Sequence, residues 1–352
     1  MFVLDSHCDT PSQILRLRDM SLDNDHAHVD FPKLARGGVD GAFFALYIPA
    51  SLDTEAASFH ARNLLDGVRR SLNDNAVLTV SARQALENKK AGRFSVFLGL
   101  ENGSPIGNDL GELARWYDAG VRYMTLCHSA DNQICDSCAS KEKTWHGLSS
   151  FGREVVAEMN RLGMLVDVSH VSDETFYDVI RHSSKPVVAT HSCCRALADH
   201  PRNMTDDMIV RLAAAGGVIQ INFYPLFLDN GFGRVLSESG IMERGEPIES
   251  EFIKDPSDPQ KRAAWNAVQD ELMALPRPSY KMIADHIDHA VSLVGTGHVG
   301  IGSDFDGIEV TPEGLEDISM MPLLFDELRY RGYSSSDIEK IAGANFLRLL
   351  DA

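Results

Sequence analysis

Two residues near the start of the chain, His7 and Asp9, have the side chains and the spacing of a metal site. They follow the apolar residues Phe2 to Leu4, which predict a buried β-strand. Side chains two positions apart on an extended chain point to the same side, so an imidazole and a carboxylate can face one cation together. Such a triplet also arises by chance on a surface turn, and the rest of the chain must decide between the two interpretations.

Histidines and acidic residues recur where later apolar runs end. Each lies at or just beyond the carboxyl end of a predicted strand: Glu101, His128, His170, His191 and Asp304. In a parallel barrel the carboxyl ends of the strands converge on one mouth, where active sites of this architecture are built. Independent core histidines have no reason to share one barrel end, so the recurrence predicts a metal site.

The ligand types indicate the metal and its chemistry. Nitrogen and oxygen donors without a thiolate suit zinc, and Mn, Co or Fe are tolerable alternatives. We expect His7 and Asp9 to hold one ion, His170 and His191 to hold a second, and Glu101 to bridge them. Two ions about 3.5–4 Å apart would share a hydroxide, because coordination lowers the pKa of water to roughly 7. The predicted reaction is hydrolysis of a polarised carbonyl.

Three further residues receive roles in this reaction. Asp304 is placed to take a proton from the hydroxide and return it to a leaving amine, and His128 to stabilise the oxyanion. Arg202 could hold a substrate carboxylate bidentately, although a surface charge at a helix entry is the competing interpretation. Asp306 is interpreted as a turn or supporting residue and is left out of the site.

Short strands and helices alternate along the chain and must position these residues. The predicted strands are Phe2–Leu4, Gly41–Tyr47, Phe94–Leu100, Tyr123–Leu126, Leu165–Val168, Val187–Ala189, Val218–Ile221 and Val299–Ile301. Helices are predicted behind Ser149 and Thr205 and over residues 54–74, 109–119, 173–182, 280–294 and 335–350. Short apolar strands separated by helices indicate an α/β fold, and eight of them a closed (β/α)8 TIM-type barrel. An open doubly wound sheet is the alternative, but its phosphate-binding glycine fingerprint is absent.

One segment, residues 225–278, interrupts this alternation with six of the 14 prolines and many charges. Only the part from Ala263 to Leu275 is predicted to be helical. We interpret the segment as an insertion between the seventh and eighth strands, within a single hydrolase domain spanning residues 1–352. It would lie where the substrate loops of a barrel emerge. A role in an oligomer contact, such as that of a homodimer, is the alternative.

Composition excludes several classes of partner. The net charge of −18 and the pI near 5.1 oppose binding to nucleic acid or to an anionic membrane surface, because both repel an acidic protein. No stretch approaches the roughly 20 apolar residues that span a bilayer, and the N-terminus has no secretion-type segment, so we expect a cytoplasmic protein. The six cysteines are too sparse for a disulfide framework, and Cys135 and Cys138 lack a second pair for a zinc knuckle.

Seven short motifs carry a family resemblance. In chain order they are Asp5-Ser6-His7-Cys8-Asp9, Leu100-Glu101-Asn102-Gly103, Leu126-Cys127-His128-Ser129, Asp167-Val168-Ser169-His170, Thr190-His191-Ser192, Arg202-Asn203-Met204 and Ile301-Gly302-Ser303-Asp304. With this set the chain resembles the membrane (renal) dipeptidase family, the zinc-dependent dipeptidases of peptidase family M19 within the amidohydrolase superfamily.

The resemblance implies a (β/α)8 barrel, two zinc ions and cleavage of dipeptides, often with tolerance for a D-residue at the carboxyl side. By position it gives the same ligand set as above, and it gives the substrate and proton-transfer roles to His128, Arg202 and Asp304. Two other functions stay open. One is another binuclear amidohydrolase, acting on a cyclic amide, a lactone or an N-acyl amino acid. The other is a non-catalytic metal-binding barrel.

The chain departs from the family pattern at a few positions. Ser6 and Cys8 stand where the family usually has Gly and Asn, and Asn102 stands where Gly is common. We expect these residues to alter the pocket wall and the substrate preference rather than the ligands. The insertion looks longer than its counterpart in the family. The missing secretion signal and lipid-anchor tail point to a bacterial-type cytoplasmic relative.

Overall fold

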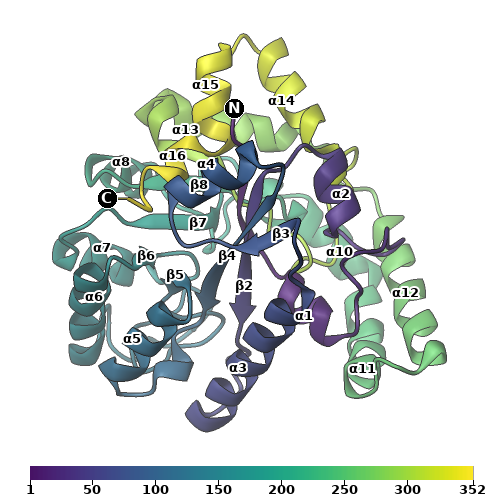
Figure 1. Ribbon diagram of the computed structural model, residues 1–352, viewed down its shortest axis with the longest axis horizontal. Coiled ribbons are helices and arrows are strands. Elements are labelled where there is room, and N and C mark those ends of the chain that lie inside the picture. Colours follow the sequence, from purple (N-terminus) through teal and green to yellow (C-terminus); the bar gives the residue numbers. More distant parts are fainter. Residues whose placement is uncertain (352) are drawn as a thin grey trace.

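Parallel strands at the centre of the molecule carry the fold (Figure 1). The computed structural model describes residues 1–351. Its strands are β1 (Leu4–Cys8), β2 (Gly41–Tyr47), β3 (Ala76–Leu78), β4 (Phe94–Glu101), β5 (Val121–Thr125), β6 (Leu165–Asp167), β7 (Val188–Ser192), β8 (Val218–Ile221) and β9 (Val299–Ile301). Neighbours follow the order β1-β2-β4-β5-β6-β7-β8-β9, and β3 pairs with β4 beside this path.

The sheet nearly closes on itself between β9 and β1. The amide of Asp9 donates to the carbonyl of Phe305 at 2.8 Å, and the amide of Asp304 donates to the carbonyl of His7 at 3.0 Å. Lower in the strands, the hydroxyl of Ser6 donates to the carbonyl of Ile301 at 3.0 Å. The predicted (β/α)8 TIM-type barrel is therefore confirmed. The short strand β3 was not predicted from the sequence.

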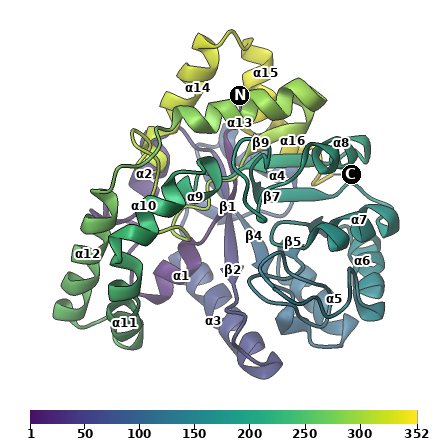
Figure 2. The same cartoon turned by 180° about the vertical axis from the view of Figure 1, so that it is seen from behind.

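Helices surround the barrel (Figures 1 and 2). They are α1 (Thr10–Leu15), α2 (Phe31–Arg36), α3 (Thr54–Ser71), α4 (Ala82–Lys90), α5 (Leu110–Asp118), α6 (Ser150–Leu162), α7 (Asp173–His182), α8 (Asp206–Ala214), α13 (Lys281–Val294), α14 (Met321–Tyr330), α15 (Ser335–Glu339) and α16 (Asn345–Leu347). Short turns η1 (Ser104–Ile106), η2 (Thr296–His298), η3 (Ile318–Met320) and the π-helical η4 (Lys340–Ala344) complete them. The predicted helices are confirmed, although η4 separates α15 from α16 where one helix was predicted.

Capping residues explain where several of these helices begin. The side chains of Ser149 and Thr205 accept hydrogen bonds from the amides of Gly152 and Met208, in the first turns of α6 and α8. At the other end of α6, Gly163 adopts a left-handed conformation with φ 81°. Among the helices of residues 1–351, none combines the length and the apolarity that a membrane span requires.

The insertion between β8 and β9 is largely helical, so the prediction that only Ala263 to Leu275 forms a helix is wrong. It contains α9 (Pro225–Leu228), α10 (Phe232–Ser239), α11 (Ile241–Lys254) and α12 (Pro259–Met273). Pro225 and Pro259 lie in first turns, where proline removes no helical hydrogen bond. Charged residues such as Glu243, Glu246 and Glu251 lie on the exposed face of α11, while Phe252, Trp265 and neighbouring residues form a small apolar cluster of their own.

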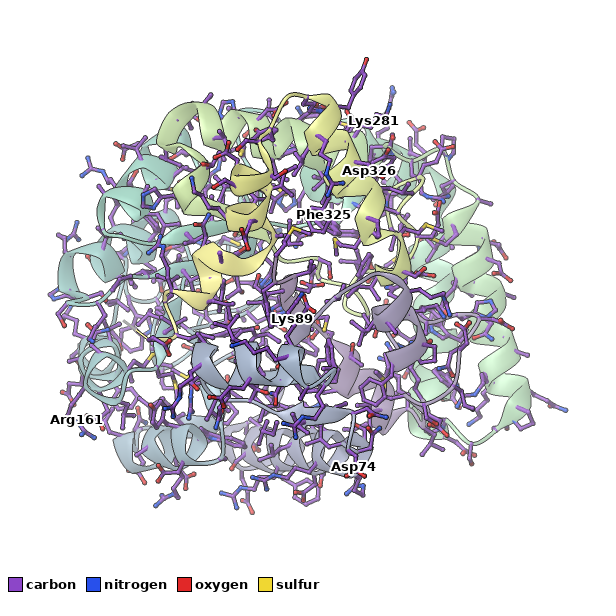
Figure 3. The ribbon with its side chains drawn as sticks, turned by 45° about the horizontal axis from the view of Figure 1, so that its top comes forward. Asp74, Lys89, Arg161, Lys281, Phe325 and Asp326 are labelled. Atoms are coloured by element: carbon purple, nitrogen blue, oxygen red, sulfur yellow. The ribbon has the colours of Figure 1, made fainter. Side chains whose placement is uncertain are left out.

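Two apolar layers hold the barrel together. One lies between the sheet and the helices, and helix α14 illustrates it: Phe325 is buried, while the next residue, Asp326, is exposed (Figure 3). The other fills the lower interior of the barrel, where the rings of Phe43 and Phe97 stack with centroids 4.8 Å apart. Tyr123 packs against Phe43 in the same layer. The histidines and carboxylates predicted to form the site lie above this layer, at the carboxyl ends of the strands.

Candidate metal centre

The structure brings seven predicted residues together at the carboxyl ends of the strands. They form three overlapping groups whose potential ligand atoms lie within 4.8 Å of one another: His7, Glu101 and His191; Glu101, His128 and His170; and His7, Asp9 and Asp304. Histidine nitrogens and carboxylate oxygens at this density are the donor set of a divalent metal site. The seven side chains therefore lie close enough together for several of them to bind one ion.

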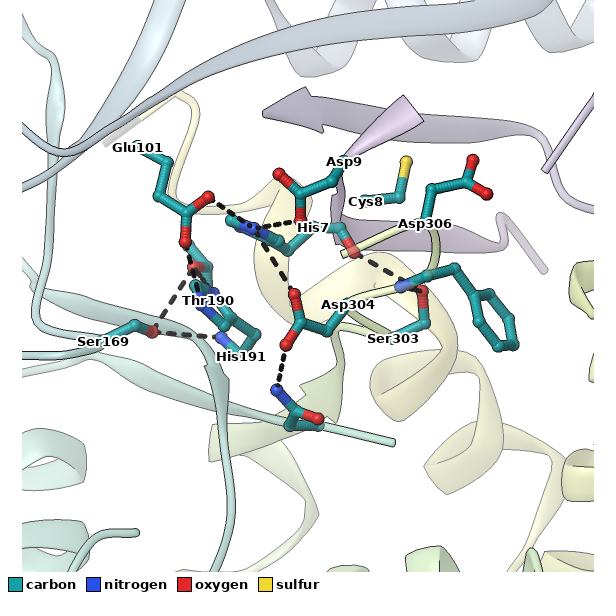
Figure 4. A network of polar contacts seen from close by, with 12 residues as sticks. His7, Cys8, Asp9, Glu101, Ser169, Thr190, His191, Ser303, Asp304 and Asp306 are labelled. Atoms are coloured by element: carbon teal, nitrogen blue, oxygen red, sulfur yellow. Dashed lines mark hydrogen bonds and ion pairs between the residues drawn. The ribbon is translucent and has the colours of Figure 1, made fainter. Parts of the chain in front are cut away.

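Glu101 lies at the centre of the cluster, with its two carboxylate oxygens facing different histidines (Figure 4). Its Oε2 is 3.5 Å from Nε2 of His7. Its Oε1 is 3.2 Å from Nε2 of His170 and 3.4 Å from Nε2 of His191. One carboxylate can therefore reach two neighbouring positions at once.

Hydrogen bonds on the far side of the rings orient His191 and His7. Nδ1 of His191 lies 2.8 Å from the hydroxyl of Thr190, which donates to Asp167 at 2.7 Å. Nδ1 of His7 lies 2.8 Å from the hydroxyl of Tyr123. Because these Nδ1 atoms are engaged outside the cluster, both Nε2 atoms point into it.

The approach of Tyr123 to His7 depends on a glycine in the neighbouring strand. A Cβ atom at Gly99 in β4 would lie 2.1 Å from the ring of Tyr123. Any side chain at position 99 would therefore displace the tyrosine that orients His7.

Buried polar atoms without partners show that this cluster fits a cation. Nε2 of His7 and Oδ1 of Asp9 are buried and have no hydrogen-bond partner among residues 1–351. Buried polar groups are satisfied in nearly all proteins, so such atoms pointing into one cluster call for a ligand. Nε2 of His170 and Nε2 of His191 lie only 2.9 Å apart. Two imidazole rings that point at one shared position have this arrangement.

The electrostatics of the cluster agree with this fit. Burial, followed by the charge of Glu101, raises the pKa of Asp9 to about 7. Burial, followed by nearby positive charge, lowers the pKa values of His170 and His191 well below the usual value. Neutral imidazoles are the metal-binding form of histidine, and a bound cation would offset the repulsion between the crowded carboxylates.

Three site residues adopt backbone conformations that side chains rarely take. The φ angles of Asn102, His170 and Asp304 are 80°, 70° and 65°. Such strain persists only where the surrounding structure enforces it, and it is concentrated at functional sites. Asn102 stands where the family commonly has Gly, and asparagine is among the residues that best tolerate this region.

The expectation that Ser6, Cys8 and Asn102 alter the pocket wall is wrong. Within residues 1–351 the pocket lining includes none of the three. The hydroxyl of Ser6 donates to the carbonyl of Thr190, the thiol of Cys8 to that of Phe43, and the amide of Asn102 to that of Ile48. All three side chains are therefore bound to the barrel wall.

Asp304 and His128 flank the cluster on opposite sides. Oδ2 of Asp304 accepts a hydrogen bond from Asn222 at 2.9 Å, while Oδ1 faces Nε2 of His7 at 3.9 Å. Nε2 of His128 is 3.8 Å from Oε1 of Glu101. Burial, followed by the charge of Arg202, lowers the pKa of His128 to about 4, so its ring is neutral at physiological pH.

Arg202 is buried beside His191 rather than exposed at a helix entry. Its Nη atoms donate to the hydroxyl of Ser192 at 3.0 Å and to the carbonyl of His191 at 2.8 Å. Its guanidinium lies 5.7 Å from the ring centroid of Phe227, which lines the pocket. Its Nε is buried without a hydrogen-bond partner among residues 1–351.

Several residues that support the site were missed from the sequence. Asp167 is the last residue of β6 and Asn222 directly follows β8, so the strand-end signal that identified the other residues also applied to them. Tyr123 and Thr190 gave no such signal, because neither is a histidine or a carboxylate and both resemble ordinary core residues. Asp306, which the sequence analysis left out of the site, forms an ion pair with Arg18 at 2.6 Å.

A cavity of about 560 Å³ opens over the cluster. Its inner wall includes Asp9, Glu101, His128, His170 and Asp304. The rest of its wall comes from the segments after β1, β2 and β9 and from the chain between β8 and β9, which contributes Tyr224, Phe227, Glu249, Ile253, Trp265 and Gln269. The insertion therefore lies over the mouth of the barrel, where the sequence placed it.

Fold and site together define a class: a (β/α)8 barrel with a cluster of histidines and carboxylates suited to divalent metal at its mouth. Comparison with protein families then identifies the family. The membrane dipeptidase family (peptidase family M19) matches residues 1–352. The chain belongs to this family of metallopeptidases, and the expectation of a hydrolase that acts on dipeptides is confirmed.

Individual relatives support this family assignment. Dipeptidase verJ of Clonostachys rogersoniana is 32% identical over 93% of this chain and 76% of that protein. Dipeptidase aclJ of Aspergillus oryzae is 32% identical over 96% of this chain and 73% of that protein. Among solved structures, a metallo peptidase from Rhodobacter sphaeroides, liganded with a phosphinate mimic of the dipeptide L-Ala-D-Ala, is 25% identical and superposes with a TM-score of 0.81. That alignment covers 100% of this chain and 99% of the other.

Proposed function

We propose that the protein is a binuclear zinc dipeptidase that hydrolyses the peptide bond of dipeptides. His7 and Asp9 would hold one ion, His170 and His191 the second, and Glu101 would bridge them. The observation that carries this proposal is the orientation of Glu101, whose two oxygens face different histidines, Oε2 toward His7 and Oε1 toward His170. The absence of thiolates from the donor set favours zinc, with Mn, Co or Fe as alternatives.

Bound zinc would lower the pKa of water to roughly 7 and polarise the scissile carbonyl, which is the chemistry that amide hydrolysis needs at neutral pH. The residues of the chain supply the other parts of the reaction. Oδ1 of Asp304 would take a proton from the attacking water and pass it to the leaving amine. Asn222 supports this role, because it holds the other oxygen of the carboxylate and fixes its orientation.

His128 and Arg202 would bind the substrate on either side of the bond that breaks. A neutral His128 can donate one ring N–H to the carbonyl oxygen as negative charge develops there. Arg202 would hold the substrate carboxylate, and its unpartnered Nε supports this role. A free carboxylate one residue beyond the scissile bond is what distinguishes a dipeptide from a longer peptide.

We extend the proposal to dipeptides with a D-residue at the carboxyl side. The relative from Rhodobacter sphaeroides was liganded with a mimic of L-Ala-D-Ala, which supports such a substrate here as well. We also propose that residues 1–352 form one hydrolase domain in which the insertion completes the substrate pocket.

A substrate panel tests the function. Zinc-loaded protein would be offered L-Ala-L-Ala, L-Ala-D-Ala, N-acetyl-alanine and a cyclic imide, and steady-state rates would be compared. We expect turnover of the two free dipeptides. Robust turnover of the N-acyl or cyclic compound without dipeptide turnover would reject the proposal in favour of another amidohydrolase.

A further inference from the structure

The pocket extends well beyond the candidate metal centre. Its volume of about 560 Å³ lies in the range of sites that hold drug-sized ligands, so a dipeptide of two small residues would leave much of it empty. The outer part is lined by Glu249 and Ile253 of α11, by Trp265 of α12 and by Glu309 after β9. A long substrate side chain has room to reach these residues.

Charge pairing distinguishes one acidic residue in this pocket from the others. Six acids line it, and three of them, Asp9, Glu101 and Asp304, belong to the candidate metal centre. Glu249 is paired with Arg16 at 3.0 Å, and Asp306 is paired with Arg18 at 2.6 Å. Glu309 is the one acid of these six that neither belongs to the candidate metal centre nor has a basic partner among residues 1–351.

No lysine, arginine or histidine lies at ion-pair distance from Glu309 within residues 1–351. The hydroxyl of Tyr224 is its side-chain partner. Burial, together with the nearby carboxylates of Glu249 and Asp304, raises the pKa of Glu309. A carboxylate in this setting gains stability from any cation that enters the pocket.

The binding of the substrate carboxylate indicates which part of a substrate would reach Glu309. Arg202, which would hold that carboxylate, follows β7, whereas Glu309 follows β9 and Arg16 follows β1. In a dipeptide held by Arg202, with its peptide bond over Glu101, the N-terminal residue is the part left to occupy the rest of the pocket, whose lining includes Glu309. In both ribbon views α1 lies beside α11 (Figures 1 and 2). Arg16, next to α1, forms an ion pair with Glu249 of α11, and both residues line the pocket.

We propose that Glu309 selects dipeptides whose N-terminal residue is lysine or arginine, by receiving the cationic end of that side chain. Trp265 and Tyr224 line the same pocket and can pack against the aliphatic stem or the cation. Arg16 does not oppose this arrangement, because its charge is already paired with Glu249. The inference rests on the proposed dipeptidase function and adds a substrate class to it.

The test compares side chains of similar length that differ in charge. Values of kcat/KM would be measured for L-Lys-L-Ala and L-norleucyl-L-Ala with the zinc-loaded full chain and with the Glu309→Gln variant. We expect the wild-type protein to favour the lysyl dipeptide about tenfold or more, and the variant to lose about tenfold of that ratio. The Glu246→Gln variant is the matched control, since Glu246 is exposed on α11 outside the pocket lining, and it should keep the wild-type ratio.

Other outcomes would overturn the inference in distinguishable ways. Equal rates for the two dipeptides in the wild-type protein would mean that Glu309 selects no cationic side chain. An equal loss for both dipeptides in the Glu309→Gln variant would assign Glu309 to the α-ammonium group or to the fold. If no dipeptide in the panel is hydrolysed, the proposed function itself fails, and this inference fails with it.

Discussion

The hydroxyl of Thr190 links the ring of His191 to the buried carboxylate of Asp167. Nδ1 of His191 is 2.8 Å from this hydroxyl, and the hydroxyl donates to Asp167 at 2.7 Å. The hydroxyl proton is therefore committed to Asp167, so the hydroxyl oxygen accepts the Nδ1 proton of His191. This arrangement leaves the lone pair of Nε2 free to face Glu101, and it fixes the tautomer that a metal requires.

Replacing Thr190 should therefore weaken metal binding without removing a ligand. We expect Thr190→Val, which keeps the shape but loses the hydroxyl, to lower zinc affinity about 10- to 100-fold. Thr190→Ser keeps the hydroxyl and should bind zinc nearly as well as the wild-type protein. Competition with a chromophoric chelator measures both affinities, and equal affinities for the valine and serine variants would contradict the role of the hydroxyl.

The Asp304→Asn variant should separate proton transfer from metal binding. An amide cannot accept the proton, so we expect kcat to fall by about 100- to 10,000-fold while the zinc content stays at the wild-type value. Steady-state kinetics and metal analysis of the same preparation check the two parts. A variant with full activity would show that Asp304 does not carry the proton.

Arg202→Ala should act on substrate binding. Loss of a charge-assisted contact to the carboxylate is expected to raise KM for dipeptides about 10- to 100-fold, with the zinc content preserved. Dipeptide amides, which lack the carboxylate, provide the comparison, because their KM should change much less. An unaltered KM for free dipeptides would remove Arg202 from substrate binding.

A buried histidine away from the site should make stability depend on pH. Nδ1 of His286 accepts a hydrogen bond from the amide of Cys194 at 3.0 Å, and burial lowers the pKa of His286 to about 4. The unfolded chain binds a proton at the usual pKa of about 6.5, so the folded state loses stability as the pH falls below that value. Above this pH the histidine is neutral in both states and has no such effect.

The expected loss is about 2 kcal/mol of unfolding free energy between about pH 7 and about pH 5. Urea unfolding of metal-free wild-type protein and of the His286→Gln variant measures it, because other titrating groups affect both proteins alike. The variant should show a shallower pH dependence by this amount. Identical pH dependence in the two proteins would contradict the neutral, buried state of His286.

The residues at the carboxyl ends of the strands could be predicted because the signal that marks them, a polar side chain at the end of an apolar run, is local in the sequence. His191 follows a short apolar run in the same way as Glu101, and the geometry of a parallel barrel gathers such residues at one end. Tyr123 could not be found in this way. It lies inside β5 among apolar residues, and its contact with His7 depends on the space that Gly99 leaves in the neighbouring strand.

The insertion shows a second limit of sequence reasoning. Prolines and charges in residues 225–278 suggested irregular structure, but Pro225 and Pro259 begin helices there. Propensity is local, whereas the helices of the insertion are stabilised by burial of Phe252 and Trp265 in an apolar cluster that only the folded chain assembles.

Metal stoichiometry coupled to activity tests the central claim most directly. Protein purified without chelator would be analysed by inductively coupled plasma mass spectrometry, and hydrolysis of L-Ala-D-Ala would be followed as zinc is removed and restored. We predict two ions per chain at full activity, and loss of metal and activity together in the His191→Ala variant. Full dipeptide hydrolysis by protein that holds one ion or none per chain would contradict the binuclear centre.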